Sequence, residues 1–252
     1  MMECKVEVVI PEECRKLDQN EEWIEIVIDG KAERVRLHDY GRFYEIPGFY
    51  DQFYQDLQCR SPQVVCEALK QQIHRWGENR NPLRVLDFGA GNGQVGERLS
   101  RELNCRKLVG LDIIPEARAA AMRDRPDIYD EYYVMDLANL SEISHKNLTQ
   151  WNFNTLVTVA ALGFGDIGAQ AFANACNLMP DGAWVAFNIK DRFLTDTDES
   201  GFSQTIEILM EDGFELLESR RYRHRFSLAG EPLHYHVIVG RKNGNSRKIK
   251  TN

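Results

Sequence analysis

A glycine-rich loop in the first half of the chain contains the residues best suited to bind a ligand. Its four glycines, Gly89, Gly91, Gly93 and Gly96, follow an apolar run that ends at Phe88. Glycine lets the backbone approach a ligand closely, and a helix that begins in such a loop directs its N-terminus at that ligand. Gly91, Gly93 and Gly96 match the G-x-G-x-x-G fingerprint of dinucleotide sites. The loop therefore predicts a nucleotide-like ligand and leaves its class open.

Asp87 separates the two ligand classes that such a loop serves. It begins a D-x-G-x-G-x-G register that runs to Gly93 and starts at the expected end of a strand. A carboxylate is a poor neighbour for a pyrophosphate, because two like charges would be held close in a partly dry site. It is a good neighbour for a cation. Asp87 therefore favours a cationic ligand, and an NAD(P)-dependent oxidoreductase of Rossmann type stays as the alternative.

Alternating strands and helices must position this loop. From about residue 84 onward, β-rich runs alternate with helical patterns, which is typical of a parallel sheet with helices on both faces. We expect strands at residues 84–88, 107–112, 132–135, 155–159 and 183–189. The last two runs, 214–226 and 233–241, leave no room for a crossover helix, so they pair antiparallel if they are neighbours. The prediction is an α/β fold: a doubly wound, seven-stranded, mostly parallel sheet with an antiparallel final strand.

The first 80 residues precede this pattern and are interpreted as an N-terminal cap. Asp29-Gly30 lies between two alternating runs and predicts a β-hairpin. An aromatic-dense segment follows at residues 40–54, and Ser61-Pro62 opens a helix. We therefore divide the chain into a hairpin and helical cap, a ligand-binding domain and a disordered basic tail, at residues 1–80, 81–242 and 243–252.

The D-x-G-x-G-x-G register and the antiparallel ending together resemble class I S-adenosylmethionine-dependent methyltransferases, over about residues 82–242. The resemblance implies S-adenosylmethionine as the cofactor and S-adenosylhomocysteine as the product. The ammonium and sulfonium groups of this cofactor suit an acidic neighbour. By the same resemblance, residues of the first motif bind the cofactor: Asp87, Gly89, Ala90 and Gly91. Residues 81–242 are then the methyltransferase domain.

Later strand ends supply the remaining cofactor contacts that the resemblance implies. Asp112 ends the second strand, where an acidic side chain accepts hydrogen bonds from both ribose hydroxyls, a feature that dinucleotide enzymes share. Asp136 is placed to meet the adenine amino group, and the backbone amide of Leu137 a ring nitrogen. Asp136 as a helix N-terminal residue, and Ile113 as core rather than adenine wall, are the other interpretations. In "VAALGFGD", the fourth motif, Ala160 is expected near the methionine moiety.

Methyl transfer from a sulfonium is an in-line displacement, so the protein mainly aligns the acceptor and excludes water. No fixed catalytic motif is required, and the sequence identifies no catalytic residue. "AALG" lacks the N-P-P-Y and D-P-P-Y patterns of enzymes that methylate exocyclic amino groups of bases or glutamine amides, and no Pro-Cys follows the fourth strand. We predict transfer to an O or N atom of a small-molecule or protein acceptor. A non-catalytic S-adenosylmethionine-binding module is a further alternative.

Acceptor contacts are expected from the cap and from the C-terminal strand ends, because open α/β sheets bind ligands there. Most of the aromatic residues of the cap are expected to pack it onto the sheet. Tyr50 and Tyr54, four apart on an expected helix, are predicted to cover the cofactor. Lys190, after the fifth strand, is the candidate acceptor contact.

Two groups of basic side chains carry weaker signals. Arg221, Arg223 and Arg225 share one face of an expected strand, which suits either an anion or solvent. His234 and His236 also share a face, but two histidines without a third ligand do not make a metal site. We predict no metal.

Composition limits the setting in which the protein works. The net charge of −8 disfavours a nucleic-acid partner. No apolar stretch is long enough for a membrane helix, and the N-terminus lacks a signal-peptide pattern. The six cysteines include no C-x-x-C pair, which favours reduced thiols. We predict a cytoplasmic protein without membrane partners.

Overall fold

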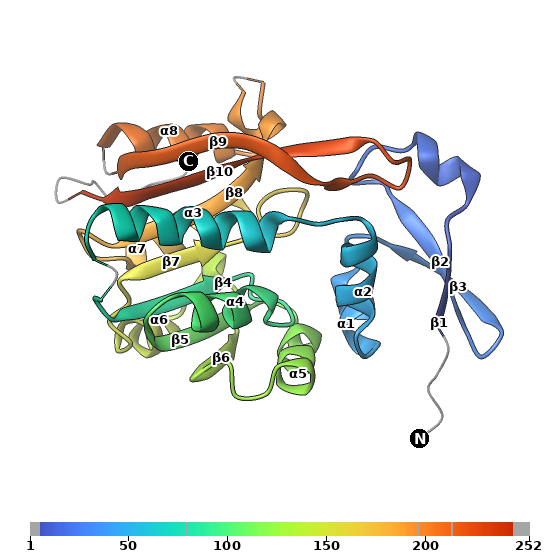
Figure 1. Ribbon diagram of the computed structural model, residues 1–252, viewed down its shortest axis with the longest axis horizontal. Coiled ribbons are helices and arrows are strands. Elements are labelled where there is room, and N and C mark those ends of the chain that lie inside the picture. The colour runs from blue at the N-terminus through green and yellow to red at the C-terminus, as the bar shows by residue number, and fades with distance from the viewer. Residues whose placement is uncertain (1–5, 79, 196, 213, 244–252) are drawn as a thin grey trace.

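The computed structural model describes residues 6–78, 80–195, 197–212 and 214–243, which form two sheets and the helices around them (Figure 1). The larger sheet has seven strands in the order β6-β5-β4-β7-β8-β10-β9. Their bounds are β4 Leu83–Phe88, β5 Cys105–Asp112, β6 Glu131–Val134, β7 Thr155–Thr158, β8 Trp184–Lys190, β9 Phe214–Phe226 and β10 Pro232–Lys242. Strands β4 to β8 are parallel, and β10 is antiparallel to both neighbours. The predicted α/β fold with an antiparallel final strand is confirmed.

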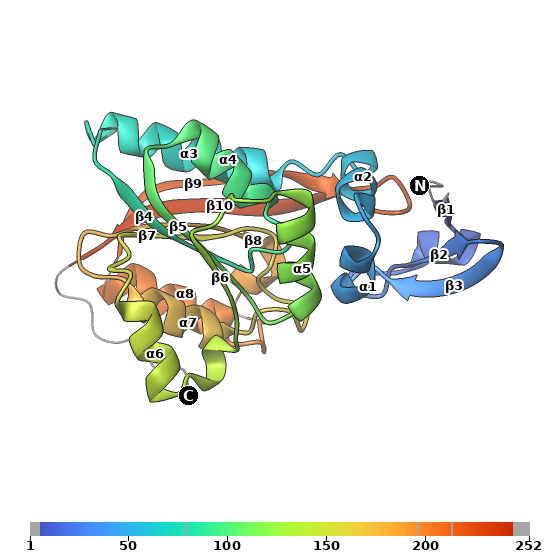
Figure 2. The same cartoon turned by 90° about the horizontal axis from the view of Figure 1, so that it is seen from below.

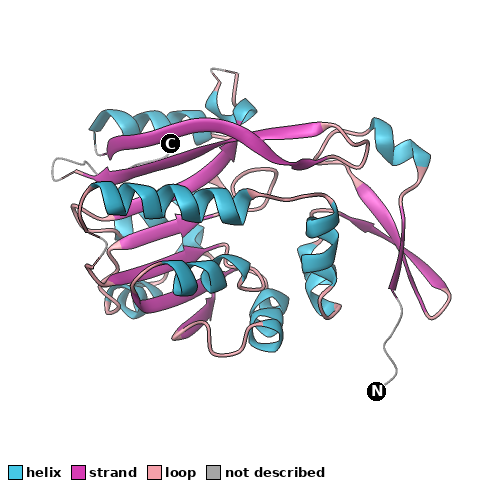
Figure 3. Cartoon of the chain, in the orientation of Figure 1, coloured by secondary structure: helices cyan, strands magenta, loops and turns pink. Residues whose placement is uncertain are grey.

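Helices cover both faces of this sheet, as Figures 2 and 3 show. Helices α3 and α4 lie on one face, helices α6, α7 and α8 lie on the other, and α5 lies beside β6. Their bounds are α3 Ser61–Arg75, α4 Gln94–Glu102, α5 Pro115–Asp124, α6 Glu142–Thr149, α7 Ala169–Leu178 and α8 Phe202–Asp212. The doubly wound arrangement places the loops after β4, β5 and β7 at one edge of the sheet.

Strand β4 shows why these residues form a central strand. Successive side chains point to opposite faces, so Val85 packs in the core cluster of α3 and α4, whereas Leu86 and Phe88 pack in the cluster of α7 and α8. All three side chains are buried. A strand covered on both faces must be nearly continuously apolar, and the charged Asp87 in this strand is therefore unusual.

The cap consists of a three-stranded antiparallel sheet and two short helices. The elements are β1 Val6–Val9, β2 Trp23–Ile28, β3 Lys31–Arg36, α1 Tyr40–Glu45 and α2 Phe49–Asp56. Asp29 and Gly30 join β2 to β3 with φ angles of 51° and 76°, both in the left-handed region that a two-residue hairpin turn requires. The predicted hairpin is confirmed, and so is the predicted helix that carries Tyr50 and Tyr54. Strand β1 was not predicted.

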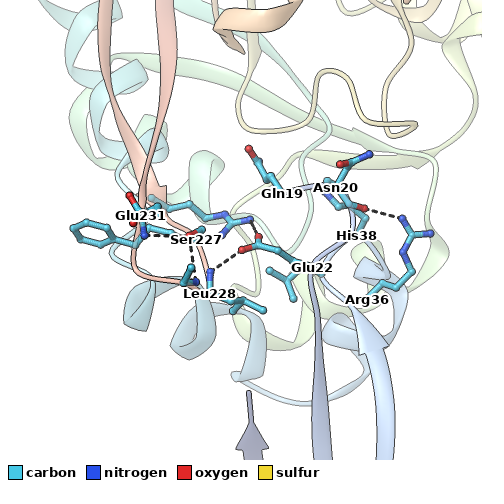
Figure 4. Close-up of polar contacts among 12 residues, drawn as sticks. Gln19, Asn20, Glu22, Arg36, His38, Ser227, Leu228 and Glu231 are labelled. Carbon is cyan, nitrogen blue, oxygen red and sulfur yellow. Dashed lines mark hydrogen bonds and ion pairs between the residues drawn. The ribbon is translucent and has the colours of Figure 1, made fainter. Parts of the chain in front are cut away.

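The cap lies on a part of the β9–β10 hairpin that extends past the sheet (Figure 1). Glu22 reaches from the N-terminal segment to this hairpin, as Figure 4 shows. Its carboxylate forms a buried ion pair with Arg225, 2.6 Å from an amino nitrogen of the guanidinium, and accepts a hydrogen bond from the backbone N–H of Leu228 at 2.6 Å. Arg225 is therefore not on an exposed strand face with Arg223. A bulge in the β9–β10 register between Leu233 and His234 changes the alternation here.

Helix α3 packs against α4 and against strands β8, β9 and β10, although it precedes residue 80. The division of the chain at residue 80 stays a prediction. Of the predicted tail at 243–252, residues 244–252 lie outside the described part of the chain. No helix within the described residues has the length and apolar character to span a bilayer.

Candidate functional site

A cavity of about 310 Å³ lies at the C-terminal ends of β4, β5 and β7, between the sheet and the cap. Its size is that of a site for a small organic ligand. Eight of the sequence-predicted site residues line it: Gly89, Ala90, Gly91, Asp112, Ile113, Ala160, Tyr50 and Tyr54. The structure thus brings the glycine loop, two later strand ends and helix α2 together at one cavity.

The glycine loop is held in a conformation that only small residues permit. Gly89 and Ala90 donate their backbone N–H groups to the carbonyl oxygen of Leu111, at 2.8 and 3.1 Å. Gly89 has a φ of 75°, and a Cβ there would lie 2.6 Å from the Cβ of Ala161. A Cβ on Gly91 would lie 2.5 Å from the hydroxyl of Tyr44. Both Cβ positions are taken by neighbouring side chains, so these glycines let the loop pack closely against Ala161 and Tyr44.

Asp112 joins the glycine loop to the end of β5. Its Oδ2 accepts the backbone N–H of Gly91 at 2.9 Å, and its Oδ1 accepts that of Ile114 at 3.1 Å. Burial raises the pKa of this carboxyl group, opposed by these backbone hydrogen bonds. Asp112 lines the cavity, and each of its carboxylate oxygens has further acceptor capacity. The arrangement suits a ligand with neighbouring hydroxyl groups.

Asp87 lies beneath the glycine loop, fully buried, and is not part of the cavity wall. Its Oδ2 accepts a hydrogen bond from the hydroxyl of Tyr129 at 2.7 Å. Its Oδ1 has no partner among the described residues. Burial raises the pKa of Asp87 to about 7, although the Tyr129 hydrogen bond acts in the opposite direction. Without a nearby cation, this carboxyl group is therefore mostly protonated below about pH 7, and ionising it is costly.

Asp136 and Leu137 lie outside the cavity lining. Asp136 accepts hydrogen bonds from the backbone N–H of Ala138 at 2.8 Å and from the amide of Asn139 at 2.7 Å, and so caps a short 3₁₀ helix. Leu137 is buried in the core. Ile113 lies at the cavity rim and is 59% exposed, so it is not core. The adenine contacts assigned to Asp136 and Leu137 stay predictions.

Four tyrosines of the cap form one wall of the cavity. The Tyr50 ring packs between Tyr44 and Tyr54 in tilted geometry, with its centroid 4.9 and 4.6 Å from theirs. Tyr40 completes the wall, 6.3 Å from the ring of Tyr44. Burial raises the pKa of each of these phenols, so all four are neutral hydrogen-bonding groups. Tyr40 and Tyr44 were not among the predicted site residues, because they lie on α1 and not on the helix that carries Tyr50 and Tyr54.

A polar contact closes helix α2 over the glycine loop. Asp51 accepts hydrogen bonds from the side-chain amides of Asn92 at 2.7 Å and Gln94 at 2.9 Å, and its other oxygen pairs with Arg125 at 2.6 Å. Arg125 also pairs with Glu97 of α4. Helix α2 is therefore fixed to both the loop and α5, with Tyr50 and Tyr54 turned over the cavity.

Lys190 ends β8 away from this cavity and lies outside its lining. Its Nζ lies 4.9 Å from the ring centre of Phe164, a cation–π contact. Burial and the charge of Arg192 lower the pKa of the Lys190 amine. Its predicted acceptor contact is not tested by this placement. Within the described residues, no group of three or more histidine, cysteine or acidic side chains is placed to bind a metal.

The sequence interpretation also missed His38 and Asp166, which both line the cavity. Asp166 is the final residue of the "VAALGFGD" stretch, so its place in the same motif as Ala160 was a usable signal. His38 lies between β3 and α1 in a loop that carries no motif. Only the folded chain shows that the two residues meet.

Several solved structures with a similar fold are methyltransferases. The magnesium protoporphyrin IX methyltransferase of Synechocystis PCC 6803, solved with bound S-adenosylmethionine, aligns with a TM-score of 0.51 and 15% identity over 72% of this chain and 79% of its own. A proposed RNA methyltransferase from Pyrococcus horikoshii aligns with a TM-score of 0.54 and 14% identity, over 75% and 87% of the two chains. Neither a family model nor a curated protein matches the sequence. The chain has the class I S-adenosylmethionine-dependent methyltransferase fold that the resemblance implied.

Proposed function

We propose that this chain is an S-adenosylmethionine-dependent methyltransferase that acts on an O or N atom of a small molecule. The observation that carries the proposal is the position of Asp112, whose carboxylate is fixed by Gly91 and Ile114 at the edge of the cavity. A carboxylate held in this way accepts hydrogen bonds from two neighbouring ribose hydroxyls. The bound cofactor would supply an activated methyl group on a sulfonium.

Other features of the site fit this cofactor. Gly89, Ala90 and Gly91 line the cavity without bulky side chains, which would let the methionine and ribose parts approach the loop. The unpartnered Oδ1 of Asp87, behind the loop, favours a cationic ligand because the positive charge stabilises the ionised carboxylate. The tyrosine wall and the Asp51 contacts exclude water from the transfer.

Gly96 does not decide between the two ligand classes. A Cβ on Gly96 would lie 2.5 Å from the hydroxyl of Tyr129, and the third glycine of a dinucleotide fingerprint also serves close packing. The buried carboxyl group of Asp87 beneath the loop is what disfavours a pyrophosphate there. If the chain were an oxidoreductase, mixing it with NADH or NADPH would change the nicotinamide fluorescence.

A small acceptor is favoured over a macromolecule, because the cavity has the size of a small-molecule site and the chain is acidic. A protein acceptor would have to insert a side chain past Tyr50. We place the activity in the cytoplasm, since the described cysteines are free thiols, the form that a reducing compartment maintains.

Calorimetry with S-adenosylmethionine and S-adenosylhomocysteine tests the proposal directly. Binding of both at micromolar concentrations is expected, with one site per chain. If neither ligand binds, the proposed function is wrong. If both bind and no acceptor in a broad panel is methylated, the non-catalytic module is favoured instead.

A further inference from the structure

His38 and Asp166 meet at the inner end of the cavity, one from the cap and one from the loop after β7. Nδ1 of His38 lies 3.1 Å from Oδ2 and 3.4 Å from Oδ1 of Asp166. The two side chains are 11% and 19% exposed, so the pair is largely shielded from solvent. The hydroxyl of Tyr40 lies 3.4 Å from the same nitrogen. The loop that carries Asp166 is the one that also carries Ala160, at the cavity wall.

A second, smaller chamber of about 30 Å³ adjoins the cavity behind this pair. His38, Asp166 and Ala160 line both spaces, so the pair lies at their junction. The chamber has room for roughly one water-sized group. Four polar side chains line the chamber but not the cavity: Gln19, His224, Arg225 and Tyr235.

Asp166 determines which nitrogen of His38 is basic. With its proton on Nδ1, the imidazole donates to the Asp166 carboxylate, and Nε2 is left as an acceptor. No hydrogen bond to Nε2 is formed by any residue that the structure describes. The carboxylate also stabilises the imidazolium that forms when Nε2 takes a proton. This is the arrangement of a general base with an orienting partner.

The other charged and titratable groups near His38 leave this role intact. Arg225 is neutralised by its ion pair with Glu22. Burial and the charges of Arg225 and Lys190 lower the pKa of His224 well below its usual range, so His224 stays neutral. Tyr40 is a neutral phenol because burial raises its pKa. Asp166 is the one carboxylate lining the chamber, among the described residues.

The walls define the kind of acceptor that fits. The rings of Tyr40, Tyr44 and Tyr50 offer faces and edges to a flat molecule. Gln19 is 7% exposed and donates to the hydroxyl of Tyr235 at 2.8 Å, but its Oε1 has no partner among the described residues. A buried amide oxygen of this kind requires a donor, which an acceptor with a second O–H group would supply. A phenol is also easier for imidazole to deprotonate than an alkyl alcohol.

Resting on the proposed function, we propose that His38 is the catalytic base and that the acceptor is a small phenol with a second hydrogen-bond donor. The O–H bond of the phenol breaks and its proton passes to Nε2 of His38. The oxygen lone pair forms the new bond to the methyl carbon as the carbon–sulfur bond breaks, and that electron pair stays on sulfur. Asp166 is a positioning residue in this step, and Gln19 recognises the second donor.

The state of His38 is tested without knowing the acceptor. Nitrogen NMR of the histidine-labelled full chain with S-adenosylhomocysteine should show His38 in the Nδ1–H tautomer, with the signal assigned by its loss in His38→Gln. Asp166→Asn should convert the ring toward the Nε2–H form. A wild-type His38 that carries its proton on Nε2 at neutral pH overturns the assignment of the base.

The acceptor is tested with the three dihydroxybenzenes (catechol, resorcinol and hydroquinone) and their monomethyl ethers, using S-adenosylmethionine labelled in the methyl group. At least one dihydroxybenzene should be methylated faster than its ether, and Gln19→Leu should remove this preference. His38→Gln should lower the transfer rate about 100-fold or more while S-adenosylhomocysteine binding is unchanged. His145→Gln, an exposed substitution on α6, is the matched control and should transfer at the wild-type rate.

Each negative result of these experiments has a distinct interpretation. No transfer to any of the six phenols overturns the acceptor assignment, and full activity in His38→Gln overturns the base. In both cases calorimetric binding of S-adenosylmethionine leaves the proposed function standing. Absence of that binding contradicts the proposed function itself, and the inference with it.

Discussion

Gly91 donates its backbone N–H to the carboxylate of Asp112 across 2.9 Å, so one side chain fixes the glycine loop and faces the cavity at the same time. The contact joins the ends of two adjacent parallel strands, β4 and β5. A substitution at Asp112 therefore removes both a ligand contact and the support of the loop.

The first prediction concerns this carboxylate. Asp112→Ala should weaken S-adenosylmethionine binding by about 1–3 kcal/mol, because the ribose hydroxyls and the N–H of Gly91 lose their acceptor. Titration calorimetry measures the change. Asp136→Ala tests the predicted adenine contact in the same assay: a similar loss of S-adenosylmethionine affinity would support that contact. Unchanged affinity in Asp112→Ala would place the ribose elsewhere.

The second prediction follows from the buried Asp87. Burial raises its pKa from 3.8 to about 7, so the folded chain holds a proton that the unfolded chain has released over this range. Stability should therefore fall as pH rises from about 4 to 7 and stay lower above it. Asp87→Asn should remove this contribution to the slope, measured by urea unfolding at several pH values. An unaltered slope in the variant would mean that Asp87 is ionised in the folded protein.

The same carboxyl group links cofactor binding to pH. A bound sulfonium and ammonium stabilise the ionised form of Asp87, so S-adenosylmethionine should bind more tightly above about pH 7 than below it. Calorimetry in buffers of different ionisation enthalpy should detect proton release on binding. Asp87→Asn should bind the cofactor more weakly, with a smaller proton release. Equal release by the variant and the wild type would exclude Asp87 as the source.

The third prediction concerns the contacts that hold helix α2 closed. Asp51→Asn removes the charge that pairs with Arg125 at 2.6 Å and weakens the hydrogen bonds from Asn92 and Gln94. S-adenosylhomocysteine should then dissociate about tenfold faster, equivalent to ~1.4 kcal/mol. Stopped-flow fluorescence measures this rate. Asp56→Asn, on the same helix but with an exposed partner, Gln52, is the control and should leave the rate as it is. Identical rates for all three proteins would show that the ligand leaves by another route.

The fourth prediction concerns the buried pair between the cap and the β9–β10 hairpin. Glu22→Gln should lower the free energy of unfolding by about 3–5 kcal/mol, because it leaves the Arg225 guanidinium buried without a counter-charge. Glu33→Gln breaks the pair with Arg42, in which Glu33 is 51% exposed, and should cost about 0–1 kcal/mol. Urea unfolding compares the two. A small effect at Glu22 would mean that the cap separates from the hairpin before the chain unfolds.

The fold was predictable because its signals are local. The strand from Leu83 to Phe88 is a short apolar run, the turn at Asp29-Gly30 is specific to a hairpin, and the last two strands leave no room for a helix. The glycine loop lies at the cavity, and ligand binding there stays a prediction. The short strand β1 carries no such signal, since its edge residues are mostly exposed.

The parts of the site that escaped prediction depend on residues far apart in the chain. His38 and Asp166 are separated by 128 positions, and Tyr129 reaches Asp87 over 42. Neither contact follows from spacing or periodicity. The position of Arg225 was mispredicted for a different reason. Strict alternation places its side chain on the same face as Arg223, but the irregular register of β9 and β10 turns it toward Glu22.

The extension of β9 and β10 past the sheet has a consequence for how the acceptor specificity of this protein can evolve. Most of the groups proposed to bind the methyl donor lie at the strand ends of the large sheet, whereas His38 and Gln19 lie in the cap, which rests on the hairpin extension. Substitutions at these two positions can alter acceptor choice, whereas Tyr50, Asp51 and Tyr54 of the same cap also contribute to the donor site. Selection for a new acceptor can therefore act on cap residues that do not bind the donor.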